Sequence, residues 1–194
     1  GVELHLTPIG KEAFVFFVNS RNPVTNLSVE EIQGIYTGEI TNWSQVGGNW
    51  QSIRPFQRAE NSGSQSALLR LMEGLPLLEP EEEERIAGMG GIIREVASYR
   101  NYQNAIGFSF RFYATEMVQN GDIRLLALNG VEPTRESIRN ESYPITSAFY
   151  AVTASRVGEP PLEERSEAAT ALLLWILSQV GQELVERTGY VPIS

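Results

Sequence analysis

Cysteine is absent from all 194 residues. The chain therefore has no disulfide, no thiolate nucleophile and no cysteine-based metal site, and we expect neither a metal nor a cofactor. Lysine and histidine occur once each, as Lys11 and His5. The GxxxxGK[ST] loop that binds nucleotide phosphates is excluded, because the only lysine, Lys11, does not lie in such a sequence. A Ser-His-Asp triad would depend on His5, which lies in a strand-like segment, so we expect a structural or exposed histidine.

Long apolar runs and excess positive charge are also missing. No stretch of about 18 apolar residues occurs, and GVELHLTPIG at the N-terminus lacks the basic and apolar regions of a signal peptide. The formal net charge is -9, which argues against nucleic acid or an anionic membrane as a partner, because attraction to phosphates needs a basic face. Any anion that binds is therefore held by local donors, and arginine, at 14 of the 15 basic residues, suits forked contacts with oxyanions.

The chain that remains alternates strand and helix patterns. The apolar run AFVFFV at 13–18 predicts a buried strand. Ser28 and Glu31 form a capping-box pattern, which predicts a helix over 29–37 closed by Gly38. The other predicted strands lie at 53–58, 104–110, 123–128 and 145–152, and the other predicted helices lie at 64–74, from Pro80 onward, and at 92–100, 114–121, 134–140 and 163–187. This alternation predicts an α/β protein.

The stretch FQRAENSGSQSALLRL, residues 56–71, has the pattern of an anion site. A short strand ends at Arg58, and a helix begins at the Ser-Gly-Ser triplet of Ser62, Gly63 and Ser64. A helix N-terminus offers unpaired N–H groups and a partial positive charge, and Gly63 gives a ligand close access to them. The two hydroxyls can donate, and Arg58 can supply a planar fork to two oxygens.

The same residues also have an ordinary structural interpretation. Ser62 can be a plain N-cap, Gly63 a residue that relieves a turn, and Arg58 a surface residue. Elsewhere, GMGG at 88–91 is interpreted as a flexible turn, and the glutamates after Pro80 as a solvated face. Trp43 and Trp50 could form a ligand platform, although packing at a corner is their simpler role.

Several segments taken together resemble one known family, the substrate-binding proteins of bacterial phosphate ABC importers, a branch of the two-lobed periplasmic binding proteins of type II. The resemblance runs in order through nearly the whole chain. It is carried by FVNSRNPVTNLSVEEIQGIYTGEITNW at 17–43, RAENSGS at 58–64, NAIGFSF at 104–110, SYPITSAFY at 142–150 and VGQELVERTGYVPIS at 180–194. RAENSGS resembles the family's Arg-x-x-x-Ser-Gly-Thr/Ser anion loop, with Ser64 in place of the commoner threonine.

The resemblance implies a fold with one complete α/β lobe and the remnant of a second. Residues 15–144 would form the second lobe, which carries the anion loop, and residues 1–14 and 145–194 would be hinge strands and the C-terminal part of the first lobe. Arg58 would pair with phosphate oxygens, and Ser62, Gly63 and Ser64 would cradle the same anion. Family members begin with a further first-lobe segment that often supplies a carboxylate acceptor. Nothing in this chain matches that segment, so we expect the sequence to start near the first crossing between lobes.

The implied function is non-enzymatic capture of inorganic phosphate for an ABC permease in the membrane. The implied location is outside the cytoplasm, in the periplasm or at the cell surface, with a lipid anchor as one arrangement of the longer protein. Self-association of two chains is one way to complete the site. Two alternatives stay open: a signalling or scaffolding domain of the same fold with a vestigial or different oxyanion site, and a hydrolase that uses Ser62 or Ser64, for which the sequence offers no base.

Overall fold

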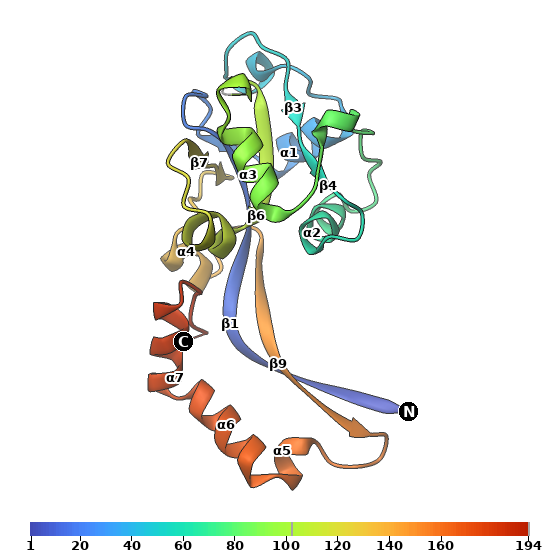
Figure 1. Cartoon of the computed structure of the whole chain (residues 1–194), viewed down its shortest axis with the longest axis vertical. Coiled ribbons are helices and arrows are strands. Elements are labelled where there is room, and N and C mark those ends of the chain that lie inside the picture. Colours follow the sequence, from blue (N-terminus) through green and yellow to red (C-terminus); the bar gives the residue numbers. More distant parts are fainter. Residues whose placement is uncertain (102, 194) are drawn as a thin grey trace.

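The longest element, β1 (Val2–Asn19), runs through both parts of the molecule (Figure 1). Its second half lies in an α/β lobe, and its first half pairs with β9 (Thr146–Arg156) as a two-stranded ribbon that leads away from the lobe. The computed structural model describes residues 1–101 and 103–193. The predicted strand at 13–18 is thus the buried half of a longer strand, and the strand-like VELHL at the N-terminus is its exposed half.

The sheet of the lobe is built around β1. Strand β6 (Ala105–Phe110) pairs antiparallel with one edge of β1, and β7 (Ile123–Leu125) pairs antiparallel with the other. Strand β3 (Arg54–Pro55) extends the sheet parallel to β6. Two smaller parallel pairs flank it: β2 (Asn26–Leu27) with β8 (Ala127–Leu128), and β4 (Gln57–Arg58) with β5 (Arg85–Ile86). The architecture is mixed α/β, as predicted.

Helices surround this sheet, and their ends follow local capping rules. Helix α1 (Val29–Thr37) begins at the predicted capping box of Ser28 and Glu31 and ends at Gly38, whose φ of 83° favours glycine. The other α-helices of the lobe are α2 (Gly63–Leu71), α3 (Met89–Ala97) and α4 (Arg135–Arg139). Short 3-10 turns occupy Trp43–Val46, Glu82–Glu84 and Tyr99–Asn101, and a π-helical turn occupies Tyr113–Met117.

Aromatic side chains fill the core of the lobe. The rings of Phe14 and Phe16 lie 5.2 Å apart edge to face, and Phe16 lies 6.1 Å from Phe108. Tyr36 of α1 completes the group at 5.9 Å from Phe108. Full burial of each such side chain contributes roughly 1.5–3 kcal/mol. This core anchors β6 through Phe108.

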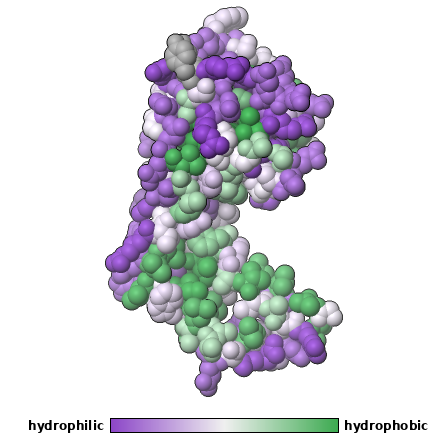
Figure 2. Space-filling view, viewed as in Figure 1, coloured by the Kyte–Doolittle hydropathy of each residue, from purple (hydrophilic) through white to green (hydrophobic). Residues whose placement is uncertain are grey.

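The ribbon has one apolar face that no described residue covers. Residues paired across β1 and β9 point to the same side, and the pairs include Leu6 with Val152 and Pro8 with Tyr150. Leu4 is 60% exposed, and Leu6 and Val152 are exposed to a similar extent. We call Val2, Leu4, Leu6, Pro8, Tyr150 and Val152 the ribbon face. Apolar residues gather over the lower part of the molecule in Figure 2.

Three helices follow the ribbon, where the sequence predicts one continuous helix over 163–187. They are α5 (Leu162–Arg165), α6 (Glu167–Leu177) and α7 (Gln179–Arg187). The prediction is wrong because Ser166 and Ser178 each leave the helical conformation and accept an N–H with the side chain as an N-cap. Within the described residues, no single helix is long and apolar enough to cross a membrane. Helices α6 and α7, which are bent by 64° relative to each other, together reach the required length and apolar composition, and length and composition are the only basis for that statement.

Five other predictions need correction. The predicted strand at 53–58 is two short strands, β3 and β4, which pair with different partners. The helix predicted from Pro80 does not form, and only the 3-10 turn Glu82–Glu84 is helical there. The chain instead continues into β5, which pairs with β4. Arg54 Nε also lies 3.2 Å from Oε1 of the buried Glu84 carboxylate. Within GMGG, residues 89–91 are the first turn of α3 and not a flexible loop. The strand at 123–128 divides into β7 and β8, and the helix at 114–121 is the π-helical turn Tyr113–Met117.

Candidate anion-binding site

The strand-loop-helix unit predicted at 56–71 forms as expected. Strand β4 ends at Arg58, residues 59–62 turn, and α2 begins at Gly63. Ser62 is the N-cap: its backbone is extended, and its Oγ accepts the N–H of Gln65 at 3.1 Å. Gly63 and Ser64 are the first two helical residues, so their N–H groups have no acceptor within the helix. These two N–H groups lie at the positive end of the helix dipole.

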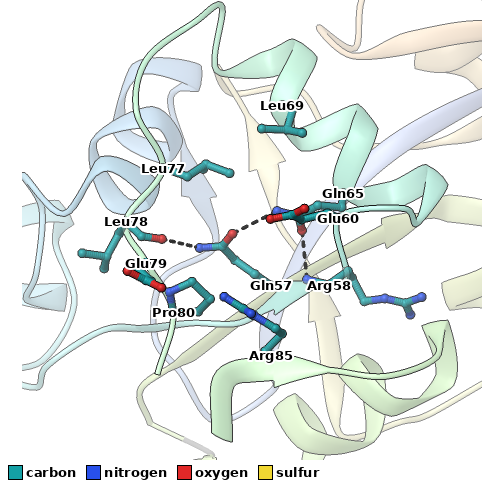
Figure 3. Close-up of a pocket in the computed structure, with 10 residues that line it drawn as sticks. All are labelled: Gln57, Arg58, Glu60, Gln65, Leu69, Leu77, Leu78, Glu79, Pro80 and Arg85. Atoms are coloured by element: carbon teal, nitrogen blue, oxygen red, sulfur yellow. Dashed lines mark hydrogen bonds between the residues drawn. The ribbon is translucent and has the colours of Figure 1, made fainter. Parts of the chain in front are cut away.

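Two buried glutamines lock this unit together, and sequence reasoning missed them. The Arg58 N–H donates to Gln65 Oε1 at 2.9 Å, and Gln65 Nε2 donates to Gln57 Oε1 at 2.9 Å. Gln57 Nε2 then donates to the carbonyl oxygen of Leu78 at 2.7 Å. Figure 3 shows this chain of amides linking β4, α2 and the segment before Pro80. Glutamine is common on surfaces, so nothing in the sequence marks these two as buried and paired.

Three buried donors at the start of α2 have no hydrogen-bond partner within the described part of the chain: Arg58 Nε, Arg58 Nη1 and Ser64 Oγ. Arg58 is only 9% exposed and Ser64 only 2%, so the surface interpretation of Arg58 is wrong. Buried polar groups are almost always paired, and each unpaired one costs about 1–3 kcal/mol. Three such donors beside a helix N-terminus have the chemistry of an anion site.

Burial lowers the pKa of Arg58, and an electrostatic interaction with Tyr113 opposes that shift. Arginine still keeps its proton at any physiological pH. The cradle formed by Arg58, Ser62, Gly63 and Ser64 is therefore a set of donors with one full positive charge. Among its side chains, only the two hydroxyls also have acceptor lone pairs.

Two cavities lie near this unit, and neither is the cradle itself. One has a volume of about 370 Å³ and is lined by Glu60, Glu79 and Arg85 among others. The Arg58 side chain points away from it (Figure 3), and its carboxylates would repel an anion. The other has a volume of about 590 Å³ and lies where β6 ends; it is lined by Glu12, Met89, Phe110, Phe112, Tyr113, Met117, Ser147, Ala148, Phe149 and Tyr190.

The second cavity contains one carboxylate. Burial raises the pKa of Glu12 to about 7, against the opposing effects of the N–H groups of Ala13 and Phe112 and of the nearby Arg111. Its Oε1 accepts from Ala13 at 2.8 Å, and both of its oxygens accept from Phe112 at 3.2 to 3.3 Å. Glu12 therefore ties the base of the ribbon to the end of β6.

Comparison with known proteins identifies the family. A family model described as a PBP superfamily domain matches residues 1–180. The chain belongs to this superfamily. Among curated relatives, it is 28% identical over 191 residues to a phosphate-binding protein PstS from Borreliella burgdorferi and 25% identical over 179 residues to one from Bacillus subtilis. These alignments cover 96% and 91% of this chain but 65% and 54% of the relatives, so the chain spans about two thirds or less of their length.

Solved structures agree on the fold. A putative phosphate ABC transporter substrate-binding protein from Clostridium perfringens, solved with bound phosphate, is 27% identical with a TM-score of 0.71. The match covers 98% of this chain and 72% of that one. An ABC-type phosphate transport receptor from Vibrio cholerae is 24% identical with a TM-score of 0.74, covering 97% and 72%. The predicted resemblance and fold class are thereby confirmed.

The structure brings Arg58, Ser62, Gly63 and Ser64 together around one helix start, and it separates the other candidates from them. His5 lies on the ribbon, with Nε2 2.8 Å from Ser155 Oγ. Trp43 is buried, with its Nε1 donating to Asn104 at 3.0 Å, whereas Trp50 is 85% exposed, so they form no platform. No group of three or more His, Asp or Glu residues in the described ranges could hold a metal.

Proposed function

We propose that this chain is the phosphate-binding part of the substrate-binding component of an ABC importer. The observation that carries the proposal is the trio of unpaired buried donors, Arg58 Nε, Arg58 Nη1 and Ser64 Oγ, at the N-terminus of α2. An inorganic phosphate there would accept from all three and from the N–H groups of Gly63 and Ser64. The relatives named as phosphate-binding proteins support the same ligand.

Binding would be non-covalent. The guanidinium of Arg58 would fork onto two oxygens, and the hydroxyls of Ser62 and Ser64 would orient the anion. The single histidine, His5, pairs with Ser155 on the ribbon, so it does not serve as a base for either serine. The hydrolase alternative therefore receives no support from the geometry, and the relatives are binding proteins.

The proposed division of the chain follows the two parts seen in Figure 1. Residues 15–144 would be the second lobe, which carries the cradle. Residues 1–14 and 145–194 would be hinge strands and the C-terminal part of the first lobe, and the two lobes would close on the bound anion by a hinge. The proposed partner is an ABC permease, and the proposed place is outside the cytoplasm. These assignments rest on the relatives, which are longer than this chain.

Isothermal titration tests the proposal. The chain is stripped of anion by unfolding and refolding, and inorganic phosphate and sulfate are titrated separately. We expect saturable binding of phosphate that weakens about tenfold or more in Ser64→Ala, because this variant deletes a buried donor that has no other partner among the described residues. Absence of binding by the unaltered chain would contradict the proposal and favour the signalling or scaffolding alternative.

A further inference from the structure

Gln65 is bonded to both ends of the loop that carries the cradle. Its side-chain oxygen Oε1 accepts the backbone N–H of Arg58, at the end of β4, with a distance of 2.9 Å. Its own backbone N–H donates to Ser62 Oγ, at the start of α2, with a distance of 3.1 Å. The first of these bonds spans the turn at 59–62 and joins residues seven positions apart. Gln65 therefore fixes Arg58 and the helix start to each other.

Arg58 needs such an anchor because its own side chain supplies little of one. Within the described part of the chain, its buried Nε and Nη1 donate to no other group. Strand β4 has only two residues, and its pairing with β5 covers only two residue pairs. Two-stranded pairing alone contributes marginal stability. The Gln65 side chain thus adds a direct constraint on where the backbone of Arg58 lies relative to α2.

The amide of Gln65 is itself held in one orientation. Its Nε2 donates to Gln57 Oε1, and Gln57 Nε2 donates to the carbonyl oxygen of Leu78 (Figure 3). Gln57 is 3% exposed and Gln65 is 4% exposed, so little water competes for these bonds. An amide whose nitrogen is engaged on one side presents its oxygen to the other. The chain of amides therefore directs Oε1 of Gln65 to the Arg58 N–H.

A forked contact with an oxyanion depends on this placement. The guanidinium of Arg58 presents its N–H groups in a rigid plane, so they meet two oxygens only from a narrow range of positions. Binding sites require their contacts to be held within about 0.5 Å, and supporting hydrogen bonds behind those contacts supply that precision. A fork without support would have to be ordered when the anion binds, which lowers affinity.

We propose that Gln65 is a positioning residue for phosphate binding, which sets the place of the Arg58 guanidinium relative to the N-terminus of α2. Both bonds of its amide go to β4, so it acts through Arg58. The inference rests on the proposed function, since it concerns the same cradle, and it makes phosphate affinity depend on a residue outside the cradle. A purely structural Gln65 would instead affect stability and leave the affinity of the folded chain unchanged.

The test compares phosphate affinity, measured by isothermal titration, with thermal stability in Gln65→Met and Gln57→Met. Methionine has a similar length to glutamine and lacks the amide. Each variant removes two of the side-chain hydrogen bonds described, and one of these is shared, so Gln57→Met is the matched control. We expect similar falls in melting temperature. The phosphate affinity should fall about tenfold or more in Gln65→Met and stay within about threefold in Gln57→Met, which keeps the Arg58 N–H bond.

A second readout separates positioning of the guanidinium from general support of the cradle. Lysine carries a flexible point charge without a fork, so its contact with an anion depends less on where its backbone is held. Arg58→Lys also keeps the backbone N–H that donates to Gln65. In an Arg58→Lys background, Gln65→Met should therefore lower the phosphate affinity by about threefold or less.

Each other outcome has a definite meaning. An equal loss of affinity in Gln65→Met and Gln57→Met, or an equal loss in the Arg58 and Arg58→Lys backgrounds, would overturn the inference. Unchanged affinity in Gln65→Met would also overturn it and leave the proposed function intact. If Gln65→Met does not fold, Gln65→Asn, whose amide is one methylene shorter, takes its place with the same expectation. If the unaltered chain binds no phosphate, the proposed function fails and the inference fails with it.

Discussion

Arg58→Met should change the stability of the protein in opposite directions with and without phosphate. Without an anion, the buried guanidinium leaves Nε and Nη1 unpaired, and each such donor costs about 1–3 kcal/mol. Methionine fills a similar volume without charge. We therefore expect the free energy of unfolding of the anion-free variant to rise by about 1–2 kcal/mol. With phosphate at about 100 times its dissociation constant, the unaltered chain gains about 2.7 kcal/mol, and the variant gains almost nothing.

Thermal and urea unfolding with and without phosphate measure both effects. For a chain of this size about 1 kcal/mol corresponds to roughly 2–4 °C, so the phosphate-induced shift of the unaltered protein should be about 5–10 °C. Arg85→Met is the matched control: Arg85 lies on β5, the strand paired with β4, and is exposed. It should keep the full phosphate shift. The reasoning is refuted if Arg58→Met destabilises the anion-free protein or keeps the shift.

Three further variants test the pH dependence, the N-cap of α2 and the ribbon face. Because burial raises the pKa of Glu12 to about 7, its deprotonation opposes folding, so the free energy of unfolding should fall by about 2 kcal/mol from pH 5 to pH 8. Glu12→Gln should remove this fall in urea titrations; persistence of the same slope would contradict the assignment. Ser62→Ala should lower the free energy of unfolding by about 1 kcal/mol, because the N-cap of α2 is lost. The same variant should bind phosphate roughly tenfold more weakly. Unchanged urea unfolding would show that Ser62 does not act as an N-cap. The double variant Leu4→Ser with Val152→Ser should bind less of the dye ANS, measured as lower fluorescence, because both side chains are exposed on the ribbon face. Its free energy of unfolding should change by less than about 0.5 kcal/mol. Undiminished fluorescence would mean that the ribbon face is not exposed in solution.

Features that depend on neighbouring residues could be predicted from the sequence. The capping box of α1, the αL glycine that ends it and the N-cap at Ser62 each involve groups within four residues of one another. The order of the candidate site residues belongs to the same class, because a strand end, a turn and a helix start follow one another between Arg58 and Ser64. The family could also be predicted, since its motifs follow one another along the chain.

Features that depend on distant partners could not be predicted. Glu84 looks like one of four solvated glutamates, but Arg54 draws its carboxylate into the lobe. Gln57 and Gln65 look like surface residues, yet they join β4 to α2. The helix predicted over 163–187 fails at Ser166 and Ser178, because the chain turns there to follow the ribbon.

The sequence by itself determined the local geometry of the candidate site, since hydrogen bonds across three or four residues depend on the order of side chains alone. Only the tertiary structure decided that Arg58 and Ser64 are buried with unpaired donors, because burial depends on what the rest of the chain places around them. A long-range contact has no signature in one sequence, because its energy comes from excluding water between segments that only folding brings together.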